Sequence, residues 1–243
     1  MRLVIIRHGD PNYALDTLTP TGWEEAEILS DRVSRMDVKA FYCSPLGRAK
    51  DTSRATLEKL GRTAEICDWL QEFPARVRHT WKDEPHVIWD WLPQDMVKEP
   101  RFYDPDRWME PAIFADAGVK EQYDHVCREL DRVLSQYGYD RDGLLYTARQ
   151  PNEDTLVFFC HFGLECVLLA HLLHVSPMVL WHGFCAAPTA ITTVVTEERR
   201  PGIASWRVSA FGDTSHLYAA GREPSTSARF CEMHSNPTIR IDC

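Results

Sequence analysis

Residues 3–9 read Leu-Val-Ile-Ile-Arg-His-Gly, a short apolar, β-branched run that ends in an arginine, a histidine and a glycine. Such a run is typical of a buried strand in a parallel sheet. In open α/β sheets ligands bind beyond the carboxyl ends of the strands, so Arg7 and His8 are predicted to project into an active-site crevice. Gly9 is expected to let the backbone turn sharply there. A neighbouring guanidinium favours the neutral imidazole, which suits a nucleophile that meets an oxyanion such as phosphate.

Length and charge limit the classes of function. The chain has 243 residues, enough for one α/β domain with a single sizeable core, and a formal net charge of −9. This acidity argues against a broad surface for nucleic acid or for an anionic membrane, so a phosphate site has to be a concentrated local pocket. No segment is long enough to span a bilayer and the N-terminus carries no recognisable signal peptide, which predicts a cytoplasmic protein.

The eight cysteines predict neither a disulfide framework nor a metal site. They are scattered through helical and strand-like segments, and a chain of this length needs no disulfide bonds to be stable, so reduced thiols are expected. Cys160, His161 and Cys166 lie close together in sequence, but their spacing matches no common structural zinc site.

Strands and helices alternate along most of the chain. The patterns predict strands at residues 3–6, 40–43, 64–67 and 156–160 and helices at residues 20–35, 46–60, 123–137 and 164–173. Two further β runs, residues 190–196 and 205–211, are joined by a polar turn of the hairpin type. This order is typical of a three-layer α/β/α sandwich with a mostly parallel central sheet.

The first helix has the clearest boundary. Thr19 is the expected N-cap and Pro20 the first helical residue. Apolar residues at helical spacing predict one buried face, made of Trp23, Ala26, Leu29 and Val33.

Residues 74–118 interrupt the alternation and are interpreted as a cap inserted into a single domain that spans residues 1–220. Six prolines preclude a long helix in this segment, while its four tryptophans argue against disorder. A flap that only covers the core stays open as the alternative to a functional lid. Residues 221–243 lack periodicity, which predicts a C-terminal tail that is draped on the surface or frayed.

An ordered set of motifs resembles the histidine phosphatase superfamily, whose fold is phosphoglycerate-mutase-like. The motifs are Arg7-His8-Gly9, Leu18-Thr19-x-x-Gly22, Ser44-Pro45-Leu46-x-Arg48-Ala49, His161 after a hydrophobic strand, and Asp213-x-x-His216-Leu217. The resemblance extends from residue 2 to about residue 218 and omits the proposed cap.

The resemblance implies a role for each matching residue. His8 is expected to be the nucleophile that forms a phosphohistidine, and Arg7, Arg48 and His161 to bind the transferred phosphoryl group. Two guanidinium groups and a helix start can balance the charge of the transition state, so no metal or other cofactor is expected. Phe162 stands where the family often has glycine, and we expect it to narrow the pocket or to form an aromatic wall for the substrate.

The proton donor is harder to assign. The family usually places a glutamate after the strand that follows the Arg48 helix, and Glu72 matches that position, although the usual Trp-Glu-Gly pattern is missing. Asp83 and Glu84 remain alternatives.

For each of three residues near the motifs, the sequence leaves two possible roles open. Asp10 and Asn12 are expected either to line the entrance, where Asn12 would help to bind phosphate, or only to form local turn hydrogen bonds. His216 is expected to orient the site through hydrogen bonds or to be purely structural.

The sequence therefore predicts a metal-independent phosphatase acting on a small phosphorylated metabolite. A mutase is the alternative within the same family, but a mutase needs a second basic pocket. The candidate cations for such a pocket in the cap are Arg76, Arg78, Lys82, Arg101 and Arg107. Many carboxylates accompany them, so the net field of the cap is not strongly positive. A non-catalytic module that binds a phospholigand is the alternative from another class. No nucleic-acid or membrane partner is expected, and the oligomeric state is left open, with a homodimer among the options.

Overall fold

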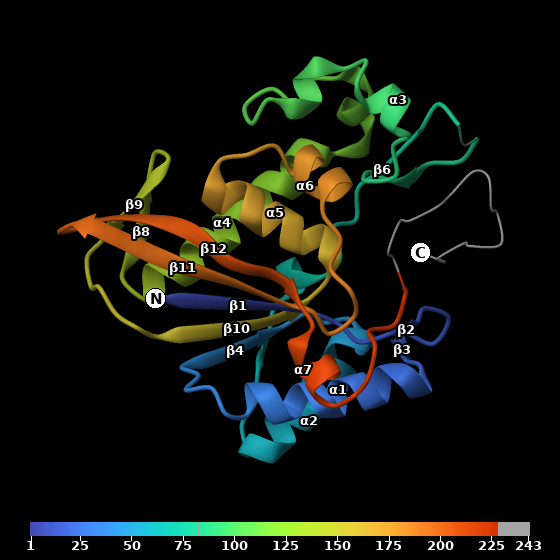
Figure 1. Ribbon diagram of the computed structural model, residues 1–243. Coiled ribbons are helices and arrows are strands. Elements are labelled where there is room, and N and C mark those ends of the chain that lie inside the picture. Colours follow the sequence, from blue (N-terminus) through green and yellow to red (C-terminus); the bar gives the residue numbers. More distant parts are fainter. Residues whose placement is uncertain (82, 228–243) are drawn as a thin grey trace.

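The computed structural model describes residues 1–81 and 83–227 of the chain (Figure 1). An eight-stranded sheet runs through its centre in the order β5-β4-β10-β1-β11-β12-β9-β8. The strands of this sheet are β1 (Arg2–Arg7), β4 (Ala40–Cys43), β5 (Glu65–Ile66), β8 (Tyr139–Asp142), β9 (Leu145–Ala148), β10 (Thr155–Cys160), β11 (Ile191–Arg200) and β12 (Ile203–Asp213). Two short pairs, β2 (Pro11–Asn12) with β3 (Thr17–Leu18) and β6 (Arg76–Val77) with β7 (His86–Val87), form separate small sheets.

The half of the sheet that carries the motifs is parallel. Strands β1, β10, β4 and β5 run in one direction, with Leu3 opposite Leu156 and Ile5 opposite Phe158. Every residue of β10 is buried, as expected for a parallel strand that is covered on both faces. The remaining strands are antiparallel, and the predicted hairpin is confirmed as β11 and β12. The β8–β9 hairpin was not predicted, because the charged residues of β8 hide the alternation of an edge strand.

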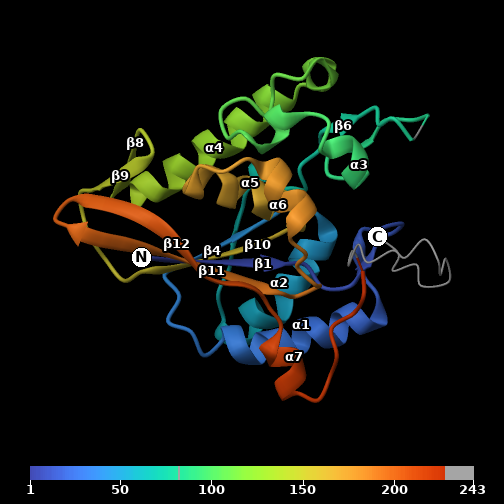
Figure 2. The same ribbon diagram turned by 45° about the horizontal axis from the view of Figure 1, so that its top comes forward.

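Helices cover both faces of the sheet and confirm the three-layer architecture (Figures 1 and 2). The helices are α1 (Pro20–Val33), α2 (Gly47–Leu60), α3 (Pro93–Met96), α4 (Val119–Gln136), α5 (Phe162–Leu173), α6 (Pro177–Gly183) and α7 (Ser215–Ala219), with 3₁₀ turns η1 (Asp68–Leu70), η2 (Pro100–Tyr103) and η3 (Ala112–Ala117). Because strand side chains alternate, Leu3 and Ile5 join the core beneath α4 and α5, while Val4 and Ile6 join the core beneath α1 and α2.

The start of α1 agrees with its prediction, and so do three of the four residues of its predicted buried face, namely Ala26, Leu29 and Val33. Thr19 caps the helix by accepting from the Gly22 amide, and Pro20 is the first helical residue. Trp23 was wrongly assigned to the core: its side chain is 37% exposed and lies under the guanidinium of Arg54. The inner face at this end is instead formed by Gly22 and Glu25.

Residues 74–118 form a compact segment beyond α5 and α6 (Figure 1). Its interior is a cluster of aromatic rings that contains Trp91, Phe102, Phe114 and Trp108. Trp108 also packs edge-on against Trp181 of α6, which ties the segment to the main domain. Burial of so many rings explains how a proline-rich segment without long helices keeps a defined structure.

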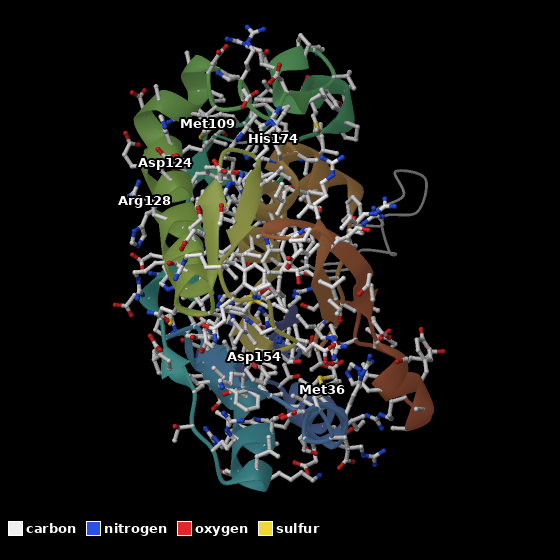
Figure 3. All side chains as sticks on the ribbon, turned by 90° about the vertical axis from the view of Figure 1, so that its left-hand side faces the viewer. Met36, Met109, Asp124, Arg128, Asp154 and His174 are labelled. Carbon is white, nitrogen blue, oxygen red and sulfur yellow. The ribbon has the colours of Figure 1, made fainter. Side chains whose placement is uncertain are left out.

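The longest helix, α4, is amphipathic as predicted. Val126, Leu130 and Val133 face the core, whereas Asp124 and Arg128 point outward (Figure 3). None of the helices in the described part of the chain has the length and apolar character that crossing a membrane requires. Five of the described cysteines are buried free thiols, namely Cys43, Cys67, Cys127, Cys160 and Cys166.

Candidate active site

The predicted convergence of the two strand ends is present. His8 follows β1 and His161 follows β10, and because these strands are parallel neighbours, both histidines lie at the same edge of the sheet. The amide of His8 donates to the carbonyl of Cys160 at 3.0 Å, and the two imidazole centroids are 5.1 Å apart. Both side chains are almost fully buried, so the sequence motifs meet in one enclosed place.

The hydrogen bonds of His8 define its tautomer. Its Nδ1 lies 2.7 Å from the carbonyl oxygen of Gly9. A carbonyl only accepts, so Nδ1 carries the proton and Nε2 carries a lone pair. Burial, together with the positive charges of Arg7 and Arg48, holds the pKa of His8 well below its usual value. The imidazole is therefore neutral, with Nε2 available as a nucleophile.

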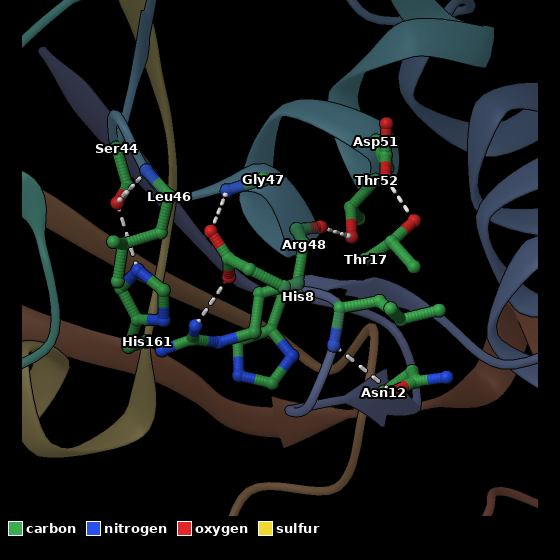
Figure 4. Close-up of polar contacts among 12 residues, drawn as sticks. His8, Asn12, Thr17, Ser44, Leu46, Gly47, Arg48, Asp51, Thr52 and His161 are labelled. Carbon is green, nitrogen blue, oxygen red and sulfur yellow. Dashed lines mark hydrogen bonds and ion pairs between the residues drawn. The ribbon is translucent and has the colours of Figure 1, made fainter.

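His161 has the same tautomer as His8, but the ring nitrogen that it leaves free is the protonated one. Its Nε2 lies 2.8 Å from the hydroxyl of Ser44, and that hydroxyl accepts from the amide of Leu46, so its own proton is free for His161 (Figure 4). This leaves the proton of a neutral His161 on Nδ1, which has no partner among the described residues. Burial and the neighbouring His8 keep the pKa of His161 well below its usual value. His161 is thus arranged as a neutral hydrogen-bond donor.

Two arginines supply positive charge. Arg7 is buried, and its Nη1 donates to the carbonyl of Ala186 at 2.6 Å and to that of Ser227 at 3.2 Å. Arg48, in the first turn of α2, donates to the carboxylate of Asp16 at 2.7 Å (Figure 4). That carboxylate also accepts from the amide of Gly47 at 2.6 Å. One guanidinium and a helix-start amide together therefore bind an oxyanion here.

Asp16 was missed by the sequence analysis. It lies in the loop between β2 and β3 at a positive φ of 46°, and it matches no motif. The signal that could have found it is the absence of a side chain at Gly47, where a Cβ would lie 1.9 Å from the Asp16 carbonyl. Tertiary contact, not local pattern, places this carboxylate beside Arg48.

The glycine in the first motif has a role in packing that was not predicted. Gly9 does not have a positive φ; instead, a Cβ at this position would lie 2.8 Å from the carbonyl of Gly22. The amide of Gly9 donates to the hydroxyl of Thr52 on α2. Gly9 and Gly22 therefore allow the nucleophile loop and the start of α1 to pack backbone against backbone.

Asp10 and Asn12 form local hydrogen bonds, which was one of the two interpretations of these residues from the sequence. The carboxylate of Asp10 accepts from the hydroxyl of Thr19 at 2.6 Å. The side-chain oxygen of Asn12 accepts from the amide of Leu15 at 3.3 Å (Figure 4). Both residues thus shape the loop after His8, and a direct contact of Asn12 with phosphate stays a prediction.

Glu72 reaches the site through the start of α5. Its Oε1 accepts from the amides of Phe73 at 2.9 Å and Leu164 at 3.0 Å, and its Oε2 from that of Gly163 at 3.4 Å. Desolvation by the surrounding protein raises its pKa, although the backbone amides, Arg48 and Arg7 oppose this effect. The alternatives Asp83 and Glu84 are exposed in the turn between β6 and β7.

Two aromatic residues adjoin Glu72 and His161. Phe162, directly after His161, is the first residue of α5 and is buried. Trp89, from the 74–118 segment, covers Gly163 so closely that a Cβ there would lie 2.6 Å from the indole and 2.7 Å from Glu72 Oε1. The proposed cap therefore brings one tryptophan directly to the candidate proton donor.

His216 supports the nucleophile loop. Its Nε2 lies 3.1 Å from the hydroxyl of Thr189, whose amide donates to the carbonyl of His8. This agrees with the reading that His216 orients the site through hydrogen bonds.

The C-terminal segment reaches the site as far as it is described. The amide of Ser225 donates to the buried carboxyl of Glu25 at 3.0 Å, and Ser227 lies against Arg7. The predicted tail is draped in this part, and residues 228–243 lie outside the described residues.

The sequence matches the family model of the histidine phosphatase superfamily (branch 1) over residues 3–209. The chain belongs to this superfamily. The predicted family is thereby confirmed. No curated protein is a significant match to this histidine phosphatase sequence.

Solved structures with similar folds include three phosphatases. A mutant phosphoserine phosphatase from Entamoeba histolytica, in complex with phosphoserine, has 20% identity and a TM-score of 0.58, over 89% of this chain and 98% of that one. A mycobacterial glucosyl-3-phosphoglycerate phosphatase has 16% identity and a TM-score of 0.58, over 88% and 99%. The alpha-ribazole phosphatase of Shigella flexneri has 18% identity and a TM-score of 0.52, over 88% and 96%. At these identities the likeness shows the fold.

Proposed function

We propose that this histidine phosphatase is a metal-independent phosphomonoesterase that hydrolyses a small phosphorylated metabolite through a phosphohistidine on His8. The observation that carries the proposal is the 2.7 Å hydrogen bond from His8 Nδ1 to the Gly9 carbonyl. It leaves the unprotonated Nε2 as the reactive atom, and the positive charges of Arg7 and Arg48 act on this imidazole.

The first step transfers the phosphoryl group to His8. Nε2 attacks phosphorus, the N–P bond forms, and the P–O bond to the leaving group breaks. Arg7, Arg48 and the Nδ1–H of His161 stabilise the charge on the three equatorial oxygens. Protonated Glu72 gives its proton to the departing oxygen.

The second step regenerates the enzyme. Water attacks the phosphohistidine, the carboxylate of Glu72 accepts the proton of this water, and the N–P bond breaks. Phosphate leaves and His8 returns to its neutral state. Asn12 and Phe162 complete the substrate pocket in this proposal, and residues 74–118 act as its cap.

The cap supports hydrolysis rather than a mutase reaction. A mutase must rebind a phosphorylated intermediate, which requires cations for a second anionic group. Arg101 is paired with Glu99, Arg107 with Glu110, and Arg78 donates to the carbonyl of Asp83. Arg76 is exposed, and Lys82 lies outside the described residues. The two ion pairs balance the charges of Arg101 and Arg107, so these two cations are less available to a second anion.

The test of the function is turnover of nitrophenyl phosphate, followed by a panel of phosphorylated metabolites assayed for free phosphate. Hydrolysis of the aryl ester with release of inorganic phosphate would support the phosphatase. Binding without turnover would contradict it in favour of a phospholigand-binding module.

Activity is expected to survive exhaustive chelation. Arg7, Arg48 and the first amides of α2 already provide the positive charge that a metal ion supplies in other phosphatases. The measurement is the rate of nitrophenyl phosphate hydrolysis after dialysis against EDTA. Complete loss of the rate, restored by added Mg²⁺ or Zn²⁺, would contradict metal independence.

Replacement of Trp89 is expected to change the order of preferred substrates. Its indole lies against Gly163 and Glu72, where the leaving group departs, so Trp89→Ala should alter the kcat/KM ratio between aryl and alkyl esters by about tenfold, the range expected for a pocket contact.

Trp91 is the matched control for Trp89. It packs in the cap interior, 5.0 Å from Phe102 and 4.9 Å from His79 between ring centroids. Trp91→Ala should lower the free energy of unfolding by about 2–4 kcal/mol with unchanged substrate order. Equal loss on all substrates in the Trp89 variant, in step with a lower Tm, would show that the segment is only a structural flap.

A further inference from the structure

A second carboxyl group, Glu165, lies beneath the candidate site and takes no part in the proposed mechanism. It is on the first turn of α5, where it is 1% exposed. Its Oε1 has no hydrogen-bond partner among the described residues. A buried carboxyl with an unused acceptor is unfavourable unless it has an electrostatic function.

Strand register places Glu165 and Arg7 on the same side of the sheet. Ile5 of β1 faces the core beneath α5 and pairs with Thr192 of β11, and Arg7, two residues further along, faces the same side. Thr192 and the positive charge of Arg7 both lower the pKa of Glu165 against the effect of its burial, so the charges of Glu165 and Arg7 act on each other.

The two arginines differ in how their charge is balanced. Arg48 has its own carboxylate partner, Asp16, at 2.7 Å. The hydrogen bonds of Arg7 within the described residues go only to carbonyls, and its Nε–H has no partner there. A buried guanidinium needs a counter-charge, and Glu165 is a buried carboxyl on the same side of the sheet whose charge acts on Arg7.

We propose that Glu165 is a positioning residue for Arg7: its carboxylate balances the guanidinium before an anion binds, and it takes up one proton from solvent when a phosphate dianion binds. Protonation removes the competing negative charge, so the full positive charge of Arg7 then acts on the phosphoryl oxygens. This inference rests on the proposed function, because it needs Arg7 in a phosphate pocket.

The ionisation of Glu165 lies in the range that such coupling needs. Burial raises its pKa to about 7, while Thr192 and Arg7 oppose the rise and Glu72 adds to it. The other ionisable groups in its surroundings are Cys160 and Cys166, whose thiols stay protonated because burial raises their pKa well above the usual value. A bound dianion disfavours the carboxylate further, which drives proton uptake near neutral pH.

Sulfate is the probe for this coupling, because it remains a dianion throughout the neutral range. Titration calorimetry of the wild type near pH 7.5, in two buffers of different ionisation enthalpy, should show proton uptake on sulfate binding. No uptake by the wild type would overturn the inference without any variant. Absence of sulfate binding altogether would overturn the phosphate pocket of the proposed function, which is a distinguishable result.

Glu165→Gln isolates the contribution of this carboxyl. The amide mimics the protonated acid in size, so the variant should bind sulfate like the wild type at pH 6.5 but about tenfold more tightly at pH 8.5, where the wild type is ionised. Glu72→Gln is the control, and in this variant the sulfate affinity should still depend on pH, with the change centred near pH 7.

A structural role gives a different result. If Glu165 only fills space or holds Thr192, Glu165→Gln will bind sulfate equally well or more weakly than the wild type at every pH, with unchanged proton uptake. That outcome would overturn the inference, because only a removable negative charge predicts tighter binding at high pH.

Discussion

His8→Ala is expected to lose turnover by a factor on the order of 10⁶, as other enzymes do when the covalent nucleophile is removed. The reason is geometric: Nε2 of His8 is the unprotonated atom, and the neighbouring His161 presents an N–H in its place. Rapid quenching with labelled substrate should trap an acid-labile, alkali-stable phosphoryl adduct on His8 of the wild type. The variant should carry no label.

His161→Ala is the matched control for this experiment. It removes a donor but leaves the nucleophile, so it should still become labelled, at a lower rate. Circular dichroism and the Tm of both variants separate chemistry from folding, since both histidines are buried. A productive adduct on any residue other than His8 would exclude the proposed mechanism.

Glu72→Gln is expected to slow alkyl phosphate hydrolysis by ~10²–10⁴-fold while slowing nitrophenyl phosphate hydrolysis far less. A basic alkoxide has to be protonated as it leaves, whereas nitrophenolate leaves without help. The glutamine oxygen can keep accepting from the amides of Phe73 and Leu164, so the side chain stays in place. Equal slowing of both esters would indicate that Glu72 positions the substrate and does not protonate the leaving group. If neither ester is hydrolysed more slowly, the general acid is another carboxyl group.

The pH profile gives an independent measure of Glu72. Desolvation raises its pKa, and an acid must be protonated to act, so kcat/KM for alkyl esters should fall as pH rises through that pKa. The pKa of His8 is lowered, so the nucleophile stays unprotonated well below pH 6.5. Titration of His8 therefore does not cause the fall of kcat/KM on the alkaline side of the profile. The alkaline limb should flatten in Glu72→Gln. An identical profile for both proteins would exclude Glu72 as the acid.

Local sequence patterns were sufficient for most of the scaffold. A buried parallel strand needs a continuous apolar run, so β1 and β10 were visible as such, and the ends of these runs placed His8 and His161. The N-cap at Thr19 was visible because capping depends on only a few adjacent residues. Trp23 was misassigned because helical spacing does not reveal which side chain meets a neighbour, and Gly22 proved to be the contact.

The sequence by itself determined the family, the sandwich and the residues that the family's motifs carry. Only the tertiary structure decided how these residues act. The tautomer of His8 depends on a carbonyl and that of His161 on the Ser44 hydroxyl, while Asp16 meets Arg48 through a contact between distant segments. Likewise, Trp89 and Trp91 are two residues apart, yet one adjoins Glu72 and the other fills the cap. Proton positions, charge balance and pocket walls depend on distances between separate elements, and no local pattern encodes those distances.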